Sequence, residues 1–455
     1  MIRKSSGDLP DLAVTGGEIV FIDRGAVTTV RASVLIRDGS IVGITPEKRP
    51  QAREILSADG MFVMPGFVNA HCHSIHLLLR GWTDGRHYHE WLEQVMYRAL
   101  PHYRAADARV AAELFCAEAI RSGITTIADS TDFGNRSDLV AATLAGIRQA
   151  GLRRIYFRTF SDSPPPTLRG NRESIQDAIA NVESLTARYD RDPLTTIGPG
   201  INEPHFVSPD GFLRAVQLAE QHGVPIMAHV AEVKADAMID DEPVVDWLLR
   251  HRLLSPRLVL AHCVWLRARD FRRIARAGAS VTWQPSTNAI LADGIMPIRS
   301  VLDCGVSVGL GTDDSNVNDH VNMFSEMRTA ALLTKIARRD ATAIAPHELL
   351  FMATLGGAQA LGLQDRVGSI AVGKRADLML LRRRGLMPVT NLASALVYQA
   401  SGEEVDTVLV DGRVVMRQRV VLTVDEPALR ARAQRCAAGV LQRSGLIQPL
   451  EGKPA

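Results

Sequence analysis

Two histidines separated by a single residue, His71 and His73, end an aliphatic stretch that predicts a buried strand. Because side chains alternate along a strand, both imidazoles lie on one face and Cys72 lies on the other. Two imidazole nitrogens at the end of one rigid element supply half of the ligands of a metal site. The first chemistry that the sequence indicates is therefore that of a metal centre.

More polar residues stand where later aliphatic stretches end. His229, His262 and Asp313 each close such a stretch, and Glu232 follows His229 three positions later. Imidazole nitrogens combined with a carboxylate suit a divalent ion such as Zn²⁺, with one position left for water. Such an ion lowers the pKa of its bound water towards neutrality and supplies hydroxide for hydrolysis.

The elements that must position these residues alternate in type. Aliphatic strand candidates alternate with stretches of helical spacing, which predicts a (β/α)8 barrel, with a doubly wound open sheet as the alternative. Ser208 as N-cap, Pro209 at the first position and Gly223 as the stop predict one of the helices. In a barrel the C-terminal ends of all strands meet at one face, so the polar strand-end residues converge there. The strands are expected at residues 62–73, 125–130, 154–160, 195–201, 225–229, 258–262, 280–286 and 307–313.

The lysines bear on the number of metal ions. Two-metal versions of such barrels need a bridging carboxylate, often a modified lysine at the end of a middle strand. The fourth predicted strand ends in GPGIN (198–202), and no lysine occurs between Lys48 and Lys234. The sequence therefore predicts a single metal ion per chain.

Both ends of the chain predict short alternating strands joined by tight turns. Asp38-Gly39 and Asp411-Gly412 favour hairpins. We expect the two ends to fold together as one small β-sandwich-like domain. The predicted division is 1–63 and 366–425 for the two parts of this β-domain, 64–365 for the barrel, and 426–455 for a C-terminal helix and tail.

Composition excludes several classes of partner. The formal net charge of +2 over 455 residues supplies no field for nucleic acid or anionic lipid. No stretch of about 20 apolar residues is present to span a membrane, and the N-terminus lacks the apolar core of a signal peptide. The five cysteines are far apart and form no C-x-x-C pair. We expect a cytoplasmic protein that acts on a small molecule and binds neither nucleic acid nor membrane.

Four segments taken together resemble the amidohydrolase superfamily. They are PGFVNAHCH (65–73), HVAE (229–232), AHC (261–263) and GTDD (311–314). GKRAD (373–377) resembles the return strand of that family's small β-domain. Within the superfamily the chain looks most like the triazine hydrolase and aminohydrolase branch. The segments that carry this resemblance are LLLRG (77–81), EWL (90–92), RSGITT (121–126) and QPSTN (284–288).

The resemblance implies a role for each strand-end residue. His71, His73, His229 and Asp313 would hold the metal ion, with Zn²⁺ first and Fe²⁺ as the alternative. His262 would hydrogen-bond the attacking water. Glu232 would carry a proton to the ring nitrogen and Asp313 would take one from the water. The implied activity is hydrolytic deamination of an amino-substituted nitrogen heterocycle with release of ammonia. Relatives are commonly dimers or higher, which implies a homo-oligomer.

The choice of substrate stays open at this point. Asp314 follows the last ligand, and in triazine-type relatives an acid at this place accompanies deamination whereas Asn accompanies dechlorination. The alternative interpretation is that Asp314 caps the helix that follows it. The alternatives are a triazine chlorohydrolase and a hydrolase that opens a cyclic amide or imide ring. Further substrate contacts are expected from Arg80, Trp82, His205 and Asn288.

Overall fold

A closed parallel sheet forms the centre of the chain. The computed structural model describes residues 9–131, 135–164, 170 and 172–446. Its largest sheet has the order β17-β16-β15-β12-β11-β10-β9-β8-β18. Only Gly311 and Thr312 separate β17 from β18, which lie at the two ends of this order, so the sheet closes on itself. The predicted barrel is confirmed. Its strands are β8 (Phe67–His73), β9 (Ile124–Thr131), β10 (Arg153–Phe160), β11 (Thr195–Ile201), β12 (Ile226–Val230), β15 (Leu258–His262), β16 (Ser280–Trp283), β17 (Ser307–Leu310) and β18 (Asp313–Asp314).

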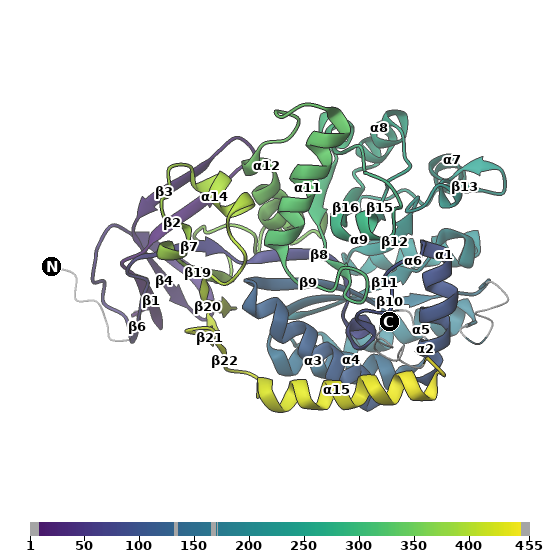
Figure 1. Ribbon diagram of the computed structural model, residues 1–455, viewed down its shortest axis with the longest axis horizontal. Helices are drawn as coiled ribbons and strands as arrows, with labels where there is room; N and C mark the ends of the chain where they lie inside the picture. Colours follow the sequence, from purple (N-terminus) through teal and green to yellow (C-terminus); the bar gives the residue numbers. More distant parts are fainter. Residues whose placement is uncertain (1–8, 132–134, 165–169, 171, 447–455) are drawn as a thin grey trace, which may run out of the picture.

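Helices surround the barrel (Figure 1). Among the described residues none of them is long and apolar enough to cross a membrane. The C-terminal helix α15 packs along α3. The helices are α1 (Tyr88–Trp91), α2 (Tyr97–Ala99), α3 (Ala105–Arg121), α4 (Ser137–Ala150), α5 (Ile175–Tyr189), α6 (Pro209–His222), α7 (Val244–Arg250), α8 (Ala268–Ala277), α9 (Pro285–Ile290), α10 (Ile298–Asp303), α11 (Met323–Arg338), α12 (Pro346–Phe351), α13 (Gly357–Ala360), α14 (Leu392–Tyr398) and α15 (Glu426–Arg443).

The two ends of the chain fold together beside the barrel, as predicted (Figure 1). One sheet has the order β5-β4-β1-β6 and the other β22-β21-β20-β19-β7-β2-β3, so strands from both ends share the second sheet. Their strands are β1 (Leu12–Thr15), β2 (Glu18–Ile22), β3 (Val27–Arg31), β4 (Ser33–Arg37), β5 (Ser40–Thr45), β6 (Glu54–Ser57), β7 (Met61–Pro65), β19 (Leu378–Arg382), β20 (Val405–Val410), β21 (Arg413–Arg417) and β22 (Val420–Val421). A separate cluster of buried aliphatic residues, including Val34, Leu56, Leu378 and Leu409, forms the core of this β-domain.

Local sequence signals account for several element ends. Ser208 caps α6 by accepting a hydrogen bond from the backbone N–H of Gly211 at 3.2 Å, and the helix stops at Gly223, whose φ is +66°. Asp38 and Gly39 both have positive φ, as a two-residue hairpin between β4 and β5 requires. These predictions are confirmed.

The first predicted strand differs from the structure. Residues 62–73 form two strands, because β7 pairs in the β-domain and β8 begins the barrel. Gly66 marks the change between them. A Cβ atom at Gly66 would lie 2.2 Å from the side chain of Thr125, so only glycine allows the chain to pass from one sheet to the other at this point.

A buried ion pair joins the β-domain to the barrel. Arg153, the first residue of β10, contacts Asp377 at 2.7 Å and Asp411 at 2.9 Å, and the side chains of Arg153 and Asp377 are 3% and 1% exposed. Replacing Arg153 with Met leaves buried carboxylates without this partner, so we expect a loss of about 3–5 kcal/mol in the free energy of unfolding. Urea denaturation measures it.

The matched control is Arg250→Met, because Arg250 pairs with Glu242 at the surface with side chains 55% and 28% exposed. A surface pair of this kind contributes about 0–1 kcal/mol. Equal urea midpoints for the two variants would contradict the structural role assigned to Arg153.

Candidate active site

The end of β8 presents two imidazoles to the C-terminal face of the barrel. Nε2 of His71 lies 3.1 Å from Oδ1 of Asp313, and Nε2 of His73 lies 3.7 Å from the same oxygen. Cys72 points the other way, with its Sγ 3.5 Å from the carbonyl oxygen of Ala128. Because β18 pairs directly with β8, the closure of the barrel brings Asp313 to these histidines.

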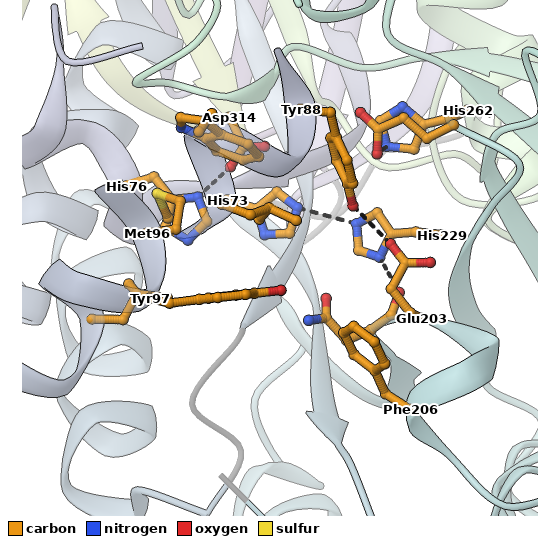
Figure 2. A pocket seen from close by; sticks show the side chains of 15 residues that line it. His73, His76, Tyr88, Met96, Tyr97, Glu203, Phe206, His229, His262 and Asp314 are labelled. Carbon is orange, nitrogen blue, oxygen red and sulfur yellow. Dashed lines mark hydrogen bonds and ion pairs between the residues drawn. The ribbon is translucent and has the colours of Figure 1, made fainter. Parts of the chain in front are cut away.

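Backbone carbonyls define the tautomers of His73 and His229. Nδ1 of His73 donates to the carbonyl of Ser130 at 3.0 Å, and Nδ1 of His229 donates to the carbonyl of Asn202 at 2.6 Å. In each neutral ring the hydrogen therefore sits on Nδ1, and Nε2 carries a lone pair. The two Nε2 atoms are 3.2 Å apart (Figure 2).

Two lone pairs that face each other at this distance need a cation between them. Nδ1–H groups that donate to backbone carbonyls are also the usual support of metal-ligating histidines. Burial, followed by the neighbouring imidazoles, lowers the pKa of His73 well below its usual range, which favours the neutral ring that a metal requires. Side-chain atoms of His71, His73 and His229 lie close enough to one another to hold one ion, and so do those of His71, His262 and Asp313. The donor set therefore fits a divalent metal such as zinc.

Asp313 is buried and backbone-strained. Its φ is +61°, in the left-handed region that non-glycine residues rarely adopt. Burial raises the pKa of its carboxyl to about 6. The two oxygens of the Asp313 carboxylate contact different histidines. Oδ1 lies 3.1 Å from Nε2 of His71, and Oδ2 lies 3.8 Å from Nε2 of His262. Such strain at the centre of a site is typical of functional residues.

His262 has the opposite tautomer from His73 and His229. The amide nitrogen of Asn288 donates towards Nδ1 of His262 at 3.1 Å, so the ring hydrogen lies on Nε2. That nitrogen is 3.4 Å from Oε2 of Glu232. Burial lowers the pKa of His262 well below its usual range. His262 therefore offers a hydrogen-bond donor to the site, and Asn288 acts on it through Nδ1.

Glu232 follows β12 and is 4% exposed. Burial raises its pKa well above the usual range, and the negative charge of Asp313 raises it further. A carboxyl group with a raised pKa keeps its proton to higher pH than an exposed glutamate does, which suits a group that transfers protons.

A pocket opens over these residues. Figure 2 shows His73, His229, His262 and Asp314 on its wall, with the hydroxyl of Tyr88 pointing to Glu203. Tyr88 donates to Oε1 of Glu203 at 2.9 Å. The remaining wall is mostly aromatic and aliphatic, as expected for a planar organic ligand. Its apolar and aromatic members are Tyr88, Trp91, Leu92, Met96, Tyr97, Leu100 and Phe206.

Asp314 lines the pocket and hydrogen-bonds Nδ1 of His76 (Figure 2). His76 in turn stacks on His73, with ring centroids 4.9 Å apart and an interplanar angle of 3°. The next long helix, α11, takes its N-cap from Asn322, whose side chain accepts from the N–H of Phe324. The Asp314 carboxylate is therefore directed at the pocket by His76, whereas the helix is capped by another residue.

Of the five residues predicted as substrate contacts, the described part of the pocket wall includes Asp314. The other four, Arg80, Trp82, His205 and Asn288, lie outside that described wall. Arg80 pairs with Glu118 at 2.7 Å, and Trp82 is half-buried against the core. His205 is about one-third exposed and lies 3.6 Å from Asp236.

Further residues near the site lie outside the predicted set. Glu203 and Tyr88, the first residue of α1, line the pocket, and Asp293 lies beside Glu232. The only signal for Glu203 was an acidic residue shortly after a barrel strand, and for Tyr88 a polar, histidine-containing loop after β8. Neither pattern distinguishes a wall residue from a surface residue.

Comparisons with known proteins agree with this geometry. The model of the amidohydrolase family matches residues 62–415. A 5-methylthioadenosine/S-adenosylhomocysteine deaminase of Syntrophobacter fumaroxidans is 35% identical over 93% of this chain and 97% of the relative. An S-triazine hydrolase of Gordonia rubripertincta is 36% identical over 65% of this chain and 67% of the relative.

A solved structure extends the match to three dimensions. The crystal structure of an adenosine deaminase from Xanthomonas campestris with bound zinc is 30% identical and has a TM-score of 0.87. The match covers 95% of this chain and 99% of that one. With the barrel and the histidine–aspartate cluster in place, the chain belongs to the amidohydrolase family and is a hydrolase of carbon–nitrogen bonds.

Proposed function

We propose that this protein is a hydrolytic deaminase of an amino-substituted nitrogen heterocycle and that it uses one divalent metal ion per chain, with zinc first and Fe²⁺ as the alternative. The observation that carries the proposal is the convergence of the metal-fitting cluster with Glu232 and Asp314 in one pocket. The ligands would be His71, His73, His229 and Asp313.

When bound, the ion supplies a water molecule of lowered pKa as the nucleophile. Asp313 accepts a proton from that water. Glu232 delivers a proton to the ring nitrogen beside the carbon under attack, because an aromatic C–N carbon accepts hydroxide only when that nitrogen is protonated. The Nε2–H of His262 donates a hydrogen bond to the incoming oxygen and holds it in place.

Asp314 acts on the leaving group. Ammonia leaves only after it gains a proton, whereas chloride leaves without one. The proton that Asp313 takes from the water passes to the amino nitrogen. The Asp314 carboxylate, oriented by His76, accepts a hydrogen bond from the protonated amino group and stabilises its positive charge until it leaves as ammonia. This arrangement supports deamination over dechlorination.

The aromatic wall and the Tyr88–Glu203 pair support a planar ring with a further polar group. Two ring systems follow from the relatives: 6-aminopurine nucleosides, after the methylthioadenosine and adenosine deaminases, and amino-triazines, after the S-triazine hydrolase. Glu203 would accept a hydrogen bond from an O–H or N–H of either class.

An ammonia-release screen tests the proposal. The zinc-loaded protein is incubated with methylthioadenosine, 5'-deoxyadenosine, adenosine, melamine, aminopyrimidines, pterins and guanine, and ammonia is measured. We expect release from at least one compound and none from the Asp313→Ala variant. Halide release from chlorotriazines without any ammonia would assign the chlorohydrolase activity instead, and ring opening of cyclic imides would assign the third alternative.

Asp314→Asn isolates the leaving-group step. We expect kcat for ammonia release to fall about 10- to 100-fold, because the neutral amide does not stabilise the protonated amino group and loses its charge-assisted contact with His76. Halide release from the chloro analogue of the same ring should be unchanged or faster. The control is Asp319→Asn, which removes a carboxyl group that the described part of the pocket wall does not contain. Equal losses for the amino and the chloro substrate would contradict the role of Asp314.

A further inference from the structure

The loop after α9 returns a buried carboxyl group, Asp293, to the C-terminal face of the barrel. Its N–H donates to the carbonyl of Asn288 at 2.9 Å, and its own carbonyl accepts from Nε1 of Trp265 at 2.7 Å. Asp293 is 4% exposed. The backbone that carries this carboxyl group is therefore held from two sides.

The carboxyl groups of Asp293 and Glu232 lie within hydrogen-bonding reach of each other. Two carboxyl groups can share a hydrogen bond only when one of them carries a proton. Oδ1 of Asp293 is buried and receives no hydrogen bond from an N–H or O–H group of any described residue. A buried oxygen that receives no hydrogen bond destabilises the fold unless it carries the proton itself and donates it. Burial raises the pKa of Asp293 to about 7, which agrees with a protonated group.

Asn288 extends this contact to His262. Its amide nitrogen lies 3.4 Å from Oδ2 of Asp293 and 3.1 Å from Nδ1 of His262. One amide nitrogen has two hydrogens and can serve both acceptors. These contacts also set the orientation of the Asn288 side-chain amide. If its oxygen and nitrogen were exchanged, the amide oxygen would face an acceptor oxygen of Asp293. One network thus connects Glu232, Asp293, Asn288 and His262.

We infer that Asp293 is a positioning residue for the deamination, in which its proton donates to one oxygen of Glu232 while its other oxygen holds Asn288 against His262. The inference rests on the proposed function. One oxygen of Glu232 is held by Asp293, and the other exchanges the proton that reaches the ring. The proton of Asp293 stays between the two carboxyl groups and is not consumed.

Asp293→Ala and Asp293→Asn are measured with the zinc-loaded enzyme. In the Ala variant Glu232 loses its donor, so we expect kcat to fall about 10- to 100-fold with KM nearly unchanged. The carboxylate form of Glu232 is no longer stabilised, so the limb of the pH profile that reports Glu232 moves to higher pH. In the Asn variant the amide still donates to Glu232, so most of kcat and the position of that limb are retained.

The direction of the pH shift is decisive. Removing an ionised Asp293 would relieve repulsion and move the limb to lower pH, which overturns the inference. The charged groups that face the pair, Asp313, Asp236, Glu203 and Asp314, are the same in all variants. Unchanged kcat and pH profile in Asp293→Ala would overturn it as well.

Infrared difference spectroscopy separates this inference from the proposed function. At neutral pH the wild type should show the carbonyl band of a buried carboxylic acid that disappears in Asp293→Asn and persists in the surface control Asp241→Asn. This measurement requires no turnover. A protein that released no ammonia in the screen would contradict the proposed function, and a spectrum in which Asp293→Asn removes no acid band would contradict the protonated Asp293.

Discussion

Glu232→Gln should lower kcat for ammonia release by about a thousandfold while the protein keeps its metal ion. Glutamine has the shape of glutamate but cannot carry a proton to the ring nitrogen. Burial raises the pKa of Glu232, so the protonated acid persists to higher pH than for an exposed glutamate, and deamination that depends on it declines as pH rises through that raised value. The measurement is kcat as a function of pH, with metal content determined on the same samples.

Near-normal turnover in Glu232→Gln would contradict the aromatic deaminase mechanism and favour ring opening at a carbonyl, which depends less on this acid. Glu90→Gln is the matched control, since Glu90 is exposed and lies near the N-terminus of α1, outside the described pocket wall. It should retain wild-type kcat.

Removal of the metal ion has the second large expected effect. Dialysis against a chelator should abolish ammonia release, and zinc should restore it with about one ion bound per chain. His73→Ala removes one of the two Nε2 atoms that face each other, so we expect loss of the stoichiometric ion together with at least a thousandfold loss of kcat. Elemental analysis of the purified variants measures the first quantity and the ammonia assay the second.

The metal ion should also stabilise the fold. A ligand that binds only the native state at a concentration of 100 times its Kd raises the free energy of unfolding by about 2.7 kcal/mol. His205→Ala is the control, because His205 is partly exposed and does not line the described pocket. Retention of a full equivalent of zinc by His73→Ala, or two ions per wild-type chain, would contradict the single site.

Signals between residues close in sequence were sufficient to predict much of the fold. The signals at Ser208 and Gly223 act within a few residues, and α6 begins and ends where they indicate. A single strand was expected over residues 62–73, although Pro65-Gly66 stands at the break. The requirement for glycine there comes from the side chain of Thr125 on another strand, which the local sequence does not show. Predictions failed where the cause lies far away in the sequence.

The site shows the same difference between residues that could be predicted from the sequence and residues whose position depends on distant contacts. The sequence predicted that His71, His229 and Asp313 lie close together, because barrel topology places the C-terminal ends of all strands at one face. Glu203 and Asp293 sit on loops whose paths depend on tertiary contacts such as that of Trp265. Arg80, which belongs to the LLLRG segment, was expected at the substrate; in the structure its guanidinium is paired with Glu118.

The seam of the barrel has a consequence for how the chain matures. Asn69 and Thr312 hydrogen-bond across it at 2.7 Å although 243 positions separate them, and Asp313 pairs with β8 immediately beside them. A nascent chain that has emerged only as far as β16 carries His71, His73 and His229 but lacks the carboxylate that completes the cluster. With the proposed ligand set, binding of the ion at full affinity therefore requires the last strand of the barrel, and the bound ion would join the first and last strands.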